Sequence, residues 1–162
     1  MEKEQYSQEE MAAYIDYILE NDELEKAINK WAKHPKSDNN LMGVIETLVK
    51  RDEECGGLIV SVECDDIPTG AENIVLFSKN RHYYMHRVEG LEGRHYIMVF
   101  TSKKRFKECE DTSGVVMFIK ELFTYIEQHN DLDGIVFNLE KEGMVCGKDF
   151  LRLALCMMQK KD

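Results

Sequence analysis

Cys146 is the residue whose sequence surroundings come nearest to those of a catalytic nucleophile. It precedes Gly147 and Lys148, where a helix is predicted to begin, and the positive end of a helix dipole beside a lysine lowers the pKa of a thiol. No base and no orienting group follow at a spacing typical of nucleophilic catalysis. We therefore expect Cys146 to be structural and the protein not to be an enzyme, with catalysis by Cys146 as a remote alternative.

Metal and cofactor chemistry is predicted to be absent. His82 and His86 flank Tyr84 in an expected strand, where alternate residues advance about 6.6 to 7 Å, so the two rings are too far apart to share an ion. The glycines show neither the GxGxxG nor the GxxxxGK spacing of nucleotide-binding loops. The cysteines are widely spread, odd in number and without a CxxC pair: Cys55, Cys64, Cys109, Cys146 and Cys156.

A candidate binding edge is predicted where two buried strands end. Thr101 and Ser102 follow the apolar run 97–100, Asn138 follows the run 134–137, and Lys148 and Asp149 begin the last helix. The carboxyl ends of parallel strands are where open α/β sheets bind ligands, so we expect these five residues to converge. The alternative, which we favour, is local: Ser102 caps a short helix over 103–109, and Asn138 makes a turn.

These two strands are expected to be joined by a crossover. Ser113 is placed to cap a long helix whose apolar face carries Val115, Ile119, Leu122 and Ile126. A strand, a long helix and a second strand form a right-handed crossover unit in which the strands are parallel. We therefore expect a parallel pair at the centre of the sheet.

The upstream chain predicts helices and antiparallel strands. Asn21 is expected to cap a helix that ends at His34, before Pro35, and Ser37 or Asp38 to cap another. Strands are predicted at 58–62, 74–77 and 83–88, and the last two are expected to pair as a hairpin. The fold class is thus α/β: a mixed sheet with an antiparallel meander, a parallel crossover pair and helices packed on the sheet.

The same segments resemble a known family. VFTS ending at Ser102, the basic-aromatic stretch 103–106, GIVFN ending at Asn138, then GMV and KDFL, are similar to the N-terminal domain of the SseB family. Leu139 stands where that family usually has Pro, so the loop 140–143 is expected to be shaped differently. The resemblance covers roughly residues 24–155. It implies links to serine sensitivity and type III secretion but no biochemical activity.

An amphipathic helix precedes the region of resemblance. Ser7 and Glu10 form a capping box, and an apolar stripe follows at helical spacing, composed of Met11, Tyr14, Ile15, Ile18 and Leu19. We interpret residues 1–22 as an extension of a domain over 23–162. The stripe must be covered by its own domain or by a second copy in a homodimer, because the acidic opposite face is unlike that of a membrane-surface helix.

The charge balance limits the partners. Lys plus Arg is 21 and Asp plus Glu is 31, which gives a formal net charge of −10 that repels nucleic acid and anionic membranes. No apolar signal region is found near the start, and the unpaired cysteines suit a reducing compartment, so we expect a cytoplasmic protein. The expected function is a noncatalytic protein-interaction or regulatory domain. The alternative is an acidic immunity-type or inhibitor protein that binds a basic enzyme or toxin.

Overall fold

The computed structural model describes residues 7–107, 111–138 and 143–159. The helices are α1 (Gln8–Ile18), α2 (Asp22–Lys33), α3 (Asp38–Glu53), α4 (Lys103–Phe106), α5 (Ile119–Gln128) and α6 (Lys148–Gln159). The strands are β1 (Gly57–Glu63), β2 (Val75–Leu76), β3 (Tyr84–Met85), β4 (Arg87–Glu89), β5 (His95–Phe100), β6 (Ser113–Phe118), β7 (Gly134–Phe137) and β8 (Met144–Gly147). None of these helices is long and apolar enough to cross a lipid bilayer.

The strands form one mixed sheet in the order β2-β6-β1-β5-β7-β8, and β3 and β4 pair with β1 and β5 respectively. β5 and β7 are parallel, with Ile97 opposite Ile135 and Val99 opposite Phe137, which confirms the predicted crossover pair. β1 is antiparallel to both of its long neighbours, β5 and β6. The expected fold class, a mixed α/β sheet with helices packed against it, is confirmed.

Helices cover both faces of the sheet, and each face packs into its own core. A single strand contributes to both cores because its successive side chains point to opposite faces. In β1, Leu58 and Val60 enter a main core formed with α2, α3, α5 and α6. Ile59 points the other way, into a second core to which α1 contributes Ile18 and α4 contributes Phe106. The central strands are therefore apolar on both faces, as the continuous apolar runs predict.

The crossover differs in detail from the prediction. Ser113 does not cap a helix: it begins β6, and its hydroxyl donates to the carbonyl of Ile67 at 2.7 Å. The helix starts only at Ile119, so Val115 lies in a strand beside β1. The run SGVVMF contains adjacent β-branched residues, which favour a strand. A short apolar run fits a helix and a strand equally well, so pairing with β1 decides in favour of the strand.

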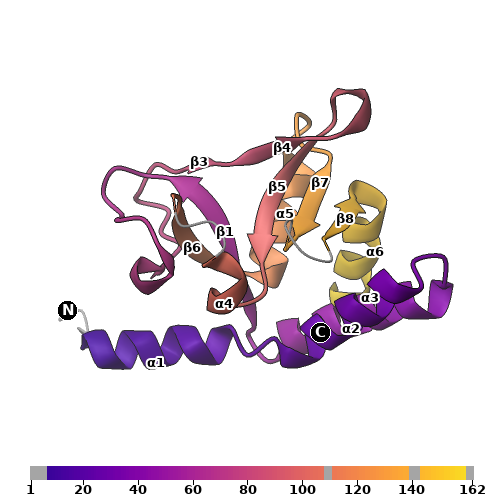
Figure 1. The fold of residues 1–162 in the computed structure, drawn as a ribbon, viewed down its shortest axis with the longest axis horizontal. Coiled ribbons are helices and arrows are strands. Elements are labelled where there is room, and N and C mark those ends of the chain that lie inside the picture. The colour runs from indigo at the N-terminus through magenta and orange to yellow at the C-terminus, as the bar shows by residue number, and fades with distance from the viewer. Residues whose placement is uncertain (1–6, 108–110, 139–142, 160–162) are drawn as a thin grey trace.

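The predicted hairpin between 74–77 and 83–88 is wrong. β2 pairs in parallel with β6 at one edge of the sheet, whereas β3 and β4 pair with β1 and β5. In Figure 1, β1 and β5 diverge toward the top of the view, and the chain through β3 and β4 crosses above them. His86 lies between β3 and β4, where its N–H donates to the Ser61 carbonyl at 3.0 Å and its own carbonyl accepts from Met98 at 3.4 Å. Bridging two diverging strands satisfies more backbone groups than an isolated hairpin would.

Candidate functional site

Thr101 and Asn138 meet at the ends of β5 and β7, as the candidate edge predicts. Both residues are buried. The Asn138 Oδ1 atom accepts from the Thr101 N–H at 3.2 Å, and Asn138 Nδ2 donates to Thr101 Oγ1 at 3.1 Å. The Thr101 hydroxyl proton goes to Glu25 Oε1, 2.6 Å away on α2. The predicted turn role of Asn138 agrees with its φ of 49°, a conformation that Asn tolerates better than most residues.

Asn21 and Arg51 extend this edge into the interior. Asn21 occupies the N-cap position of α2, as predicted, but its side chain makes no capping bond: its buried amide donates to the carbonyls of Gly57 and Thr101, both at 2.9 Å. Its Oδ1 atom accepts from Arg51 Nε at 3.1 Å. We call Asn21, Arg51, Thr101 and Asn138 the buried polar cluster. The predicted position is right, but the side chain leaves the helix because two buried carbonyls at the sheet end need a donor more than the exposed start of a helix does.

Arg51 also closes the end of α1. Its Nη2 atom donates to the carbonyl of Ile18 at 2.8 Å and to that of Tyr17 at 3.4 Å. The last turn of α1 contains no basic residue, so this guanidinium supplies the positive charge that the helix C-terminus favours. The buried polar cluster thus joins α1, α3 and the ends of β5 and β7. Its donors and acceptors are engaged in hydrogen bonds with other groups of the protein.

Lys148 and Asp149 do not join this edge, so the predicted convergence of five residues is wrong. β8 runs antiparallel to β7, with Gly147 opposite Gly134, and α6 therefore begins at the opposite end of β7 from Asn138. There the Lys148 ammonium donates to the His129 carbonyl at 2.9 Å. Asp149 lies within 3.6 Å of Arg152 on the surface of α6.

Ser102 takes the local role that the sequence favours. Its hydroxyl accepts from the N–H of Arg105 at 3.2 Å and caps α4, which ends at Phe106. The predicted helix extended to Cys109, which lies outside the described residues. The predicted difference in the loop that follows Leu139 also falls largely outside them. Of the predicted edge, the structure brings together Thr101 and Asn138, with Ser102 next in the chain.

Cys146 is enclosed in the main core. As predicted, it lies just before a helix, since α6 begins at Lys148, but it belongs to β8 and its side chain is buried. Burial raises the pKa of the Cys146 thiol above its ordinary value, because a thiolate loses hydration there. This is the opposite of the shift that a helix dipole would produce, and it lowers the thiolate fraction of Cys146.

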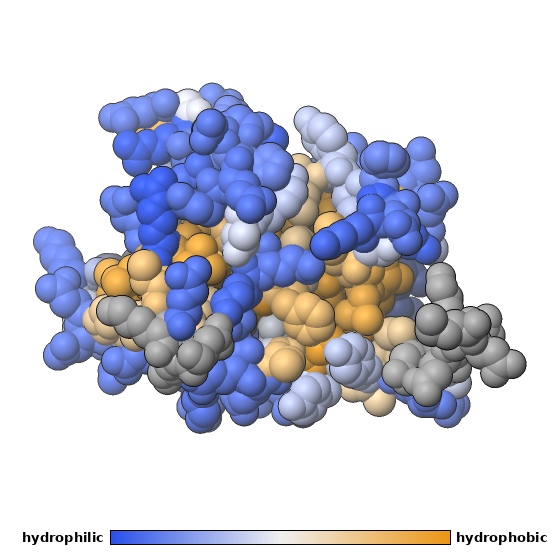
Figure 2. All heavy atoms as spheres, turned by 180° about the vertical axis from the view of Figure 1, so that it is seen from behind, coloured by the Kyte–Doolittle hydropathy of each residue, from blue (hydrophilic) through white to orange (hydrophobic). Residues whose placement is uncertain are grey.

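The apolar stripe of α1 packs on its own sheet. Ile15, Ile18 and Leu19 are buried in the second core, and Met11 packs partly buried against it. Tyr14 remains 45% exposed. It borders a hollow of about 470 Å³ with Met11 and Leu76. Seen from behind in Figure 2, apolar atoms gather in the middle of the molecule and hydrophilic side chains surround them.

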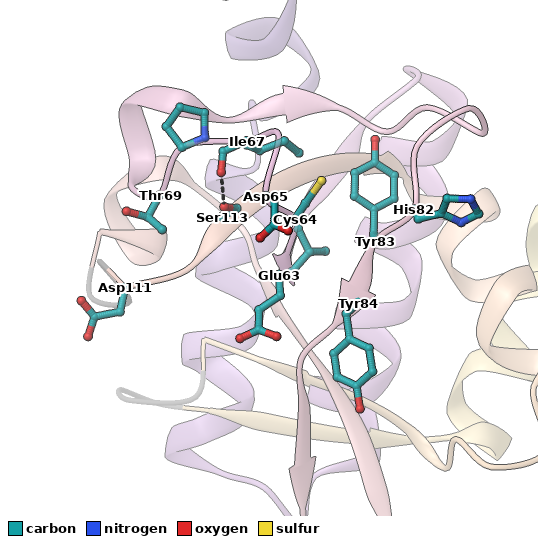
Figure 3. A pocket seen from close by; sticks show the side chains of 12 residues that line it. Glu63, Cys64, Asp65, Ile67, Thr69, His82, Tyr83, Tyr84, Asp111 and Ser113 are labelled. Carbon is teal, nitrogen blue, oxygen red and sulfur yellow. Dashed lines mark hydrogen bonds between the residues drawn. The ribbon is translucent and has the colours of Figure 1, made fainter.

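A further concave feature is a groove that the sequence does not reveal. It has a volume of about 820 Å³ and lies where the end of β1, the start of β3 and the start of β6 meet (Figure 3). The name "acidic groove" is used below for this feature, whose lining includes Glu63, Asp65, His82, Tyr83, Tyr84 and Asp111. In Figure 3 the side chains of Glu63 and Tyr84, which are register partners on β1 and β3, point to the same side.

The groove escapes sequence reasoning because its residues come from three separate segments. The acid-rich stretch ECDD ending at Asp66 is a visible signal, but it resembles an ordinary solvated loop. The pairing of β3 with β1, rather than with β2, places Tyr84 beside Glu63. Without that pairing, no pattern connects the loop to the tyrosines.

Comparison with protein families supports the resemblance seen in the motifs. The SseB protein N-terminal domain matches residues 24–152, which is most of the chain and leaves α1 outside. Comparisons with curated proteins and with solved structures found no match. Since the matched segment contains every described strand, α3 to α5 and most of α2, the chain belongs to the SseB family, by its N-terminal domain.

Proposed function

We propose that this chain is a noncatalytic protein-interaction domain with a regulatory role. One observation carries the proposal: Thr101 and Asn138, the polar groups at the carboxyl ends of the parallel strands, are buried and bonded to each other and to Asn21 and Glu25. A reactive centre needs polar groups that remain free to meet a substrate. The burial of Cys146 removes the best nucleophile candidate from the surface.

The surface supports binding rather than chemistry. Large apolar or aromatic side chains are exposed on several elements, among them Tyr14, Tyr84, Leu91, Val145 and Leu153. Aromatic residues supply much of the energy of protein interfaces because they bury a large area at a small cost in conformational entropy. Because α1 already covers its stripe with its own sheet, the proposed partner binds elsewhere, and a second copy is not needed to bury α1.

The test identifies a partner and then asks whether anything is converted. A partner captured with the tagged full-length chain would be purified and titrated into the pure chain by calorimetry. The masses of both proteins would then be measured by mass spectrometry. We expect saturable binding at a fixed stoichiometry with both masses unchanged. A covalent change in the partner, or turnover of a cellular metabolite by the pure chain, would overturn the proposal.

Two matched surface variants locate the interface. Tyr84→Ala on β3 and Leu153→Ala on α6 each remove an exposed side chain from a different element. We expect one of them to weaken binding and the other to leave it intact, with both retaining the melting temperature of the parent. Equal effects of the two variants would indicate nonspecific adhesion and contradict a defined interface.

A second candidate function is inhibition of a basic enzyme or toxin. It is favoured by the formal net charge of −10 and by the three carboxylates of the acidic groove. Complementary charge speeds association and selects partners of opposite sign. A toxin gene directly upstream, whose product loses activity on stoichiometric addition of this chain, would favour this candidate over the first.

The proposal extends to location and to excluded partners. We place the protein in the cytoplasm, supported by Cys55, Cys64, Cys146 and Cys156, which are free thiols in the structure. Nucleic acid and anionic membranes are not proposed as partners, because the net negative charge repels both. Fractionation of the source cell checks the location: recovery of the full-length chain in the membrane pellet would contradict it.

A further inference from the structure

The acidic groove concentrates negative charge that the described parts of the chain leave unpaired. Glu63, Asp65 and Asp111 are exposed, and none of them forms an ion pair within the described residues. No lysine or arginine is found among the described residues that line the groove. The carboxylates lie along a concave surface, where one ligand can meet several of them at once.

Aromatic surface lies beside these carboxylates. Tyr84 is 68% exposed and stands opposite Glu63 across the β1–β3 pair. Tyr83 is anchored: its ring is 5.3 Å from that of Phe77, and its hydroxyl accepts from the Ser78 N–H at 3.0 Å. A tyrosine face attracts an ammonium or guanidinium group, and a neighbouring carboxylate attracts the same group.

The other polar groups of the groove do not change this preference. The Ser113 hydroxyl is already used, because it donates to the Ile67 carbonyl at 2.7 Å (Figure 3). His82 is exposed at the rim. The groove therefore presents acceptors and aromatic faces, and among its described residues no cation is present to hold an anionic ligand.

We propose that the acidic groove binds a segment of a protein partner that carries lysine or arginine side chains. This inference rests on the proposed interaction function and names the surface and the partner chemistry for it. A protein segment fits better than a small free amine, because a groove of about 820 Å³ is larger than such an amine fills and its carboxylates are exposed. Exposed ion pairs and exposed cation–π contacts are individually weak, so several must act together along one chain.

The experiment uses the purified full-length chain and a short fluorescein-labelled peptide of alternating lysine and serine. Binding is followed by fluorescence anisotropy at low ionic strength. The triple variant Glu63→Gln, Asp65→Asn, Asp111→Asn should bind about tenfold more weakly, since each exposed pair contributes modestly. Tyr84→Leu should weaken binding about threefold through loss of the cation–π contact.

A charge-matched control separates the groove from the general acidity of the protein. Glu20→Gln, Glu46→Gln, Glu89→Gln removes three exposed carboxylates that do not line the groove. This control should bind the peptide within about twofold of the parent. Equal weakening by both triple variants, with melting temperatures preserved, would overturn the inference, as would a spermine affinity for the groove equal to that of the peptide.

Amide shifts in the NMR spectrum provide a second readout. Addition of the lysine peptide should move the signals of Tyr83, Tyr84 and Asp65, and the glutamate–serine counterpart should leave them in place. Shifts confined to other elements would overturn the groove assignment. The groove and the proposed function can fail independently. A partner that still binds the groove triple variant but not Leu153→Ala would refute the groove and leave the interaction function intact.

Discussion

At the scale of single residues, Asn21 is predicted to matter more than its size suggests. Its side chain donates to two carbonyls and accepts from Arg51, all in the interior. Asn21→Ala leaves those groups without partners, and each unsatisfied buried group costs about 1 to 3 kcal/mol. We expect the free energy of unfolding to fall by at least about 1 to 3 kcal/mol in urea titrations.

The control is Asn39→Ala, an exposed asparagine in the first turn of α3. This change should move the free energy of unfolding by no more than about 0.5 kcal/mol, as for most surface substitutions. A loss in Asn39→Ala as large as that in Asn21→Ala would mean that the buried polar cluster is not specially stabilising.

Cys146 should resist thiol reagents that modify its exposed counterparts. Burial raises the pKa of the Cys146 thiol, so at neutral and mildly alkaline pH its thiolate fraction lies below that of an ordinary cysteine. Cys55 and Cys156 are exposed and serve as internal controls. Iodoacetamide followed by peptide mass spectrometry should label those two first, and Cys146 only after denaturant is added. Fast labelling of Cys146 in the native protein would restore it as a nucleophile candidate.

At the scale of elements, the approach of α1 to the sheet requires a glycine. A Cβ atom at Gly57 would lie 2.7 Å from Ile18 Cγ2 and 2.7 Å from the Met117 carbonyl oxygen, so β1 or α1 must shift. We expect Gly57→Ala to lower the free energy of unfolding by about 1 to 3 kcal/mol, as overpacking does.

The matched substitution has the opposite predicted sign. Gly43 lies inside α3, and a Cβ atom there meets nothing within 4 Å. Gly43→Ala should raise the free energy of unfolding by about 0.5 to 1 kcal/mol, because alanine loses less conformational freedom in a helix. Thermal and urea unfolding of the two variants measure both signs, and a neutral Gly57→Ala would indicate that α1 is loosely held.

At the scale of the whole molecule, the net charge should make stability depend on salt. A formal charge of −10 opposes compaction by self-repulsion, which salt weakens as the Debye length shortens to about 8 Å near physiological ionic strength. We expect the melting temperature to rise with sodium chloride in this range. The rise should be smaller in Glu20→Gln, Glu46→Gln, Glu89→Gln, which carries less charge. An equal rise in both proteins would assign the effect to something other than net charge.

The sequence by itself determined the local elements of this protein. Each of these elements is set by nearby residues. Ser7 caps the first turn of α1, Ile15 and Ile18 form its apolar stripe, and Pro35 follows the end of α2. The apolar runs 97–100 and 134–137 predicted strands buried on both faces, and these strands are parallel. The meeting of Thr101 and Asn138 followed from that pairing, since parallel strands end at the same edge.

Tertiary structure alone decided which distant segments meet. Lys148 is moved away from Asn138 by the antiparallel return of β8, and Asn21 is recruited from a helix cap to strand carbonyls at the sheet end. The acidic groove arises because β3 pairs with β1, which brings Tyr84 to Glu63. Pairing between strands is chosen by the burial and backbone hydrogen bonds of the complete sheet, so no local pattern in the sequence carries it.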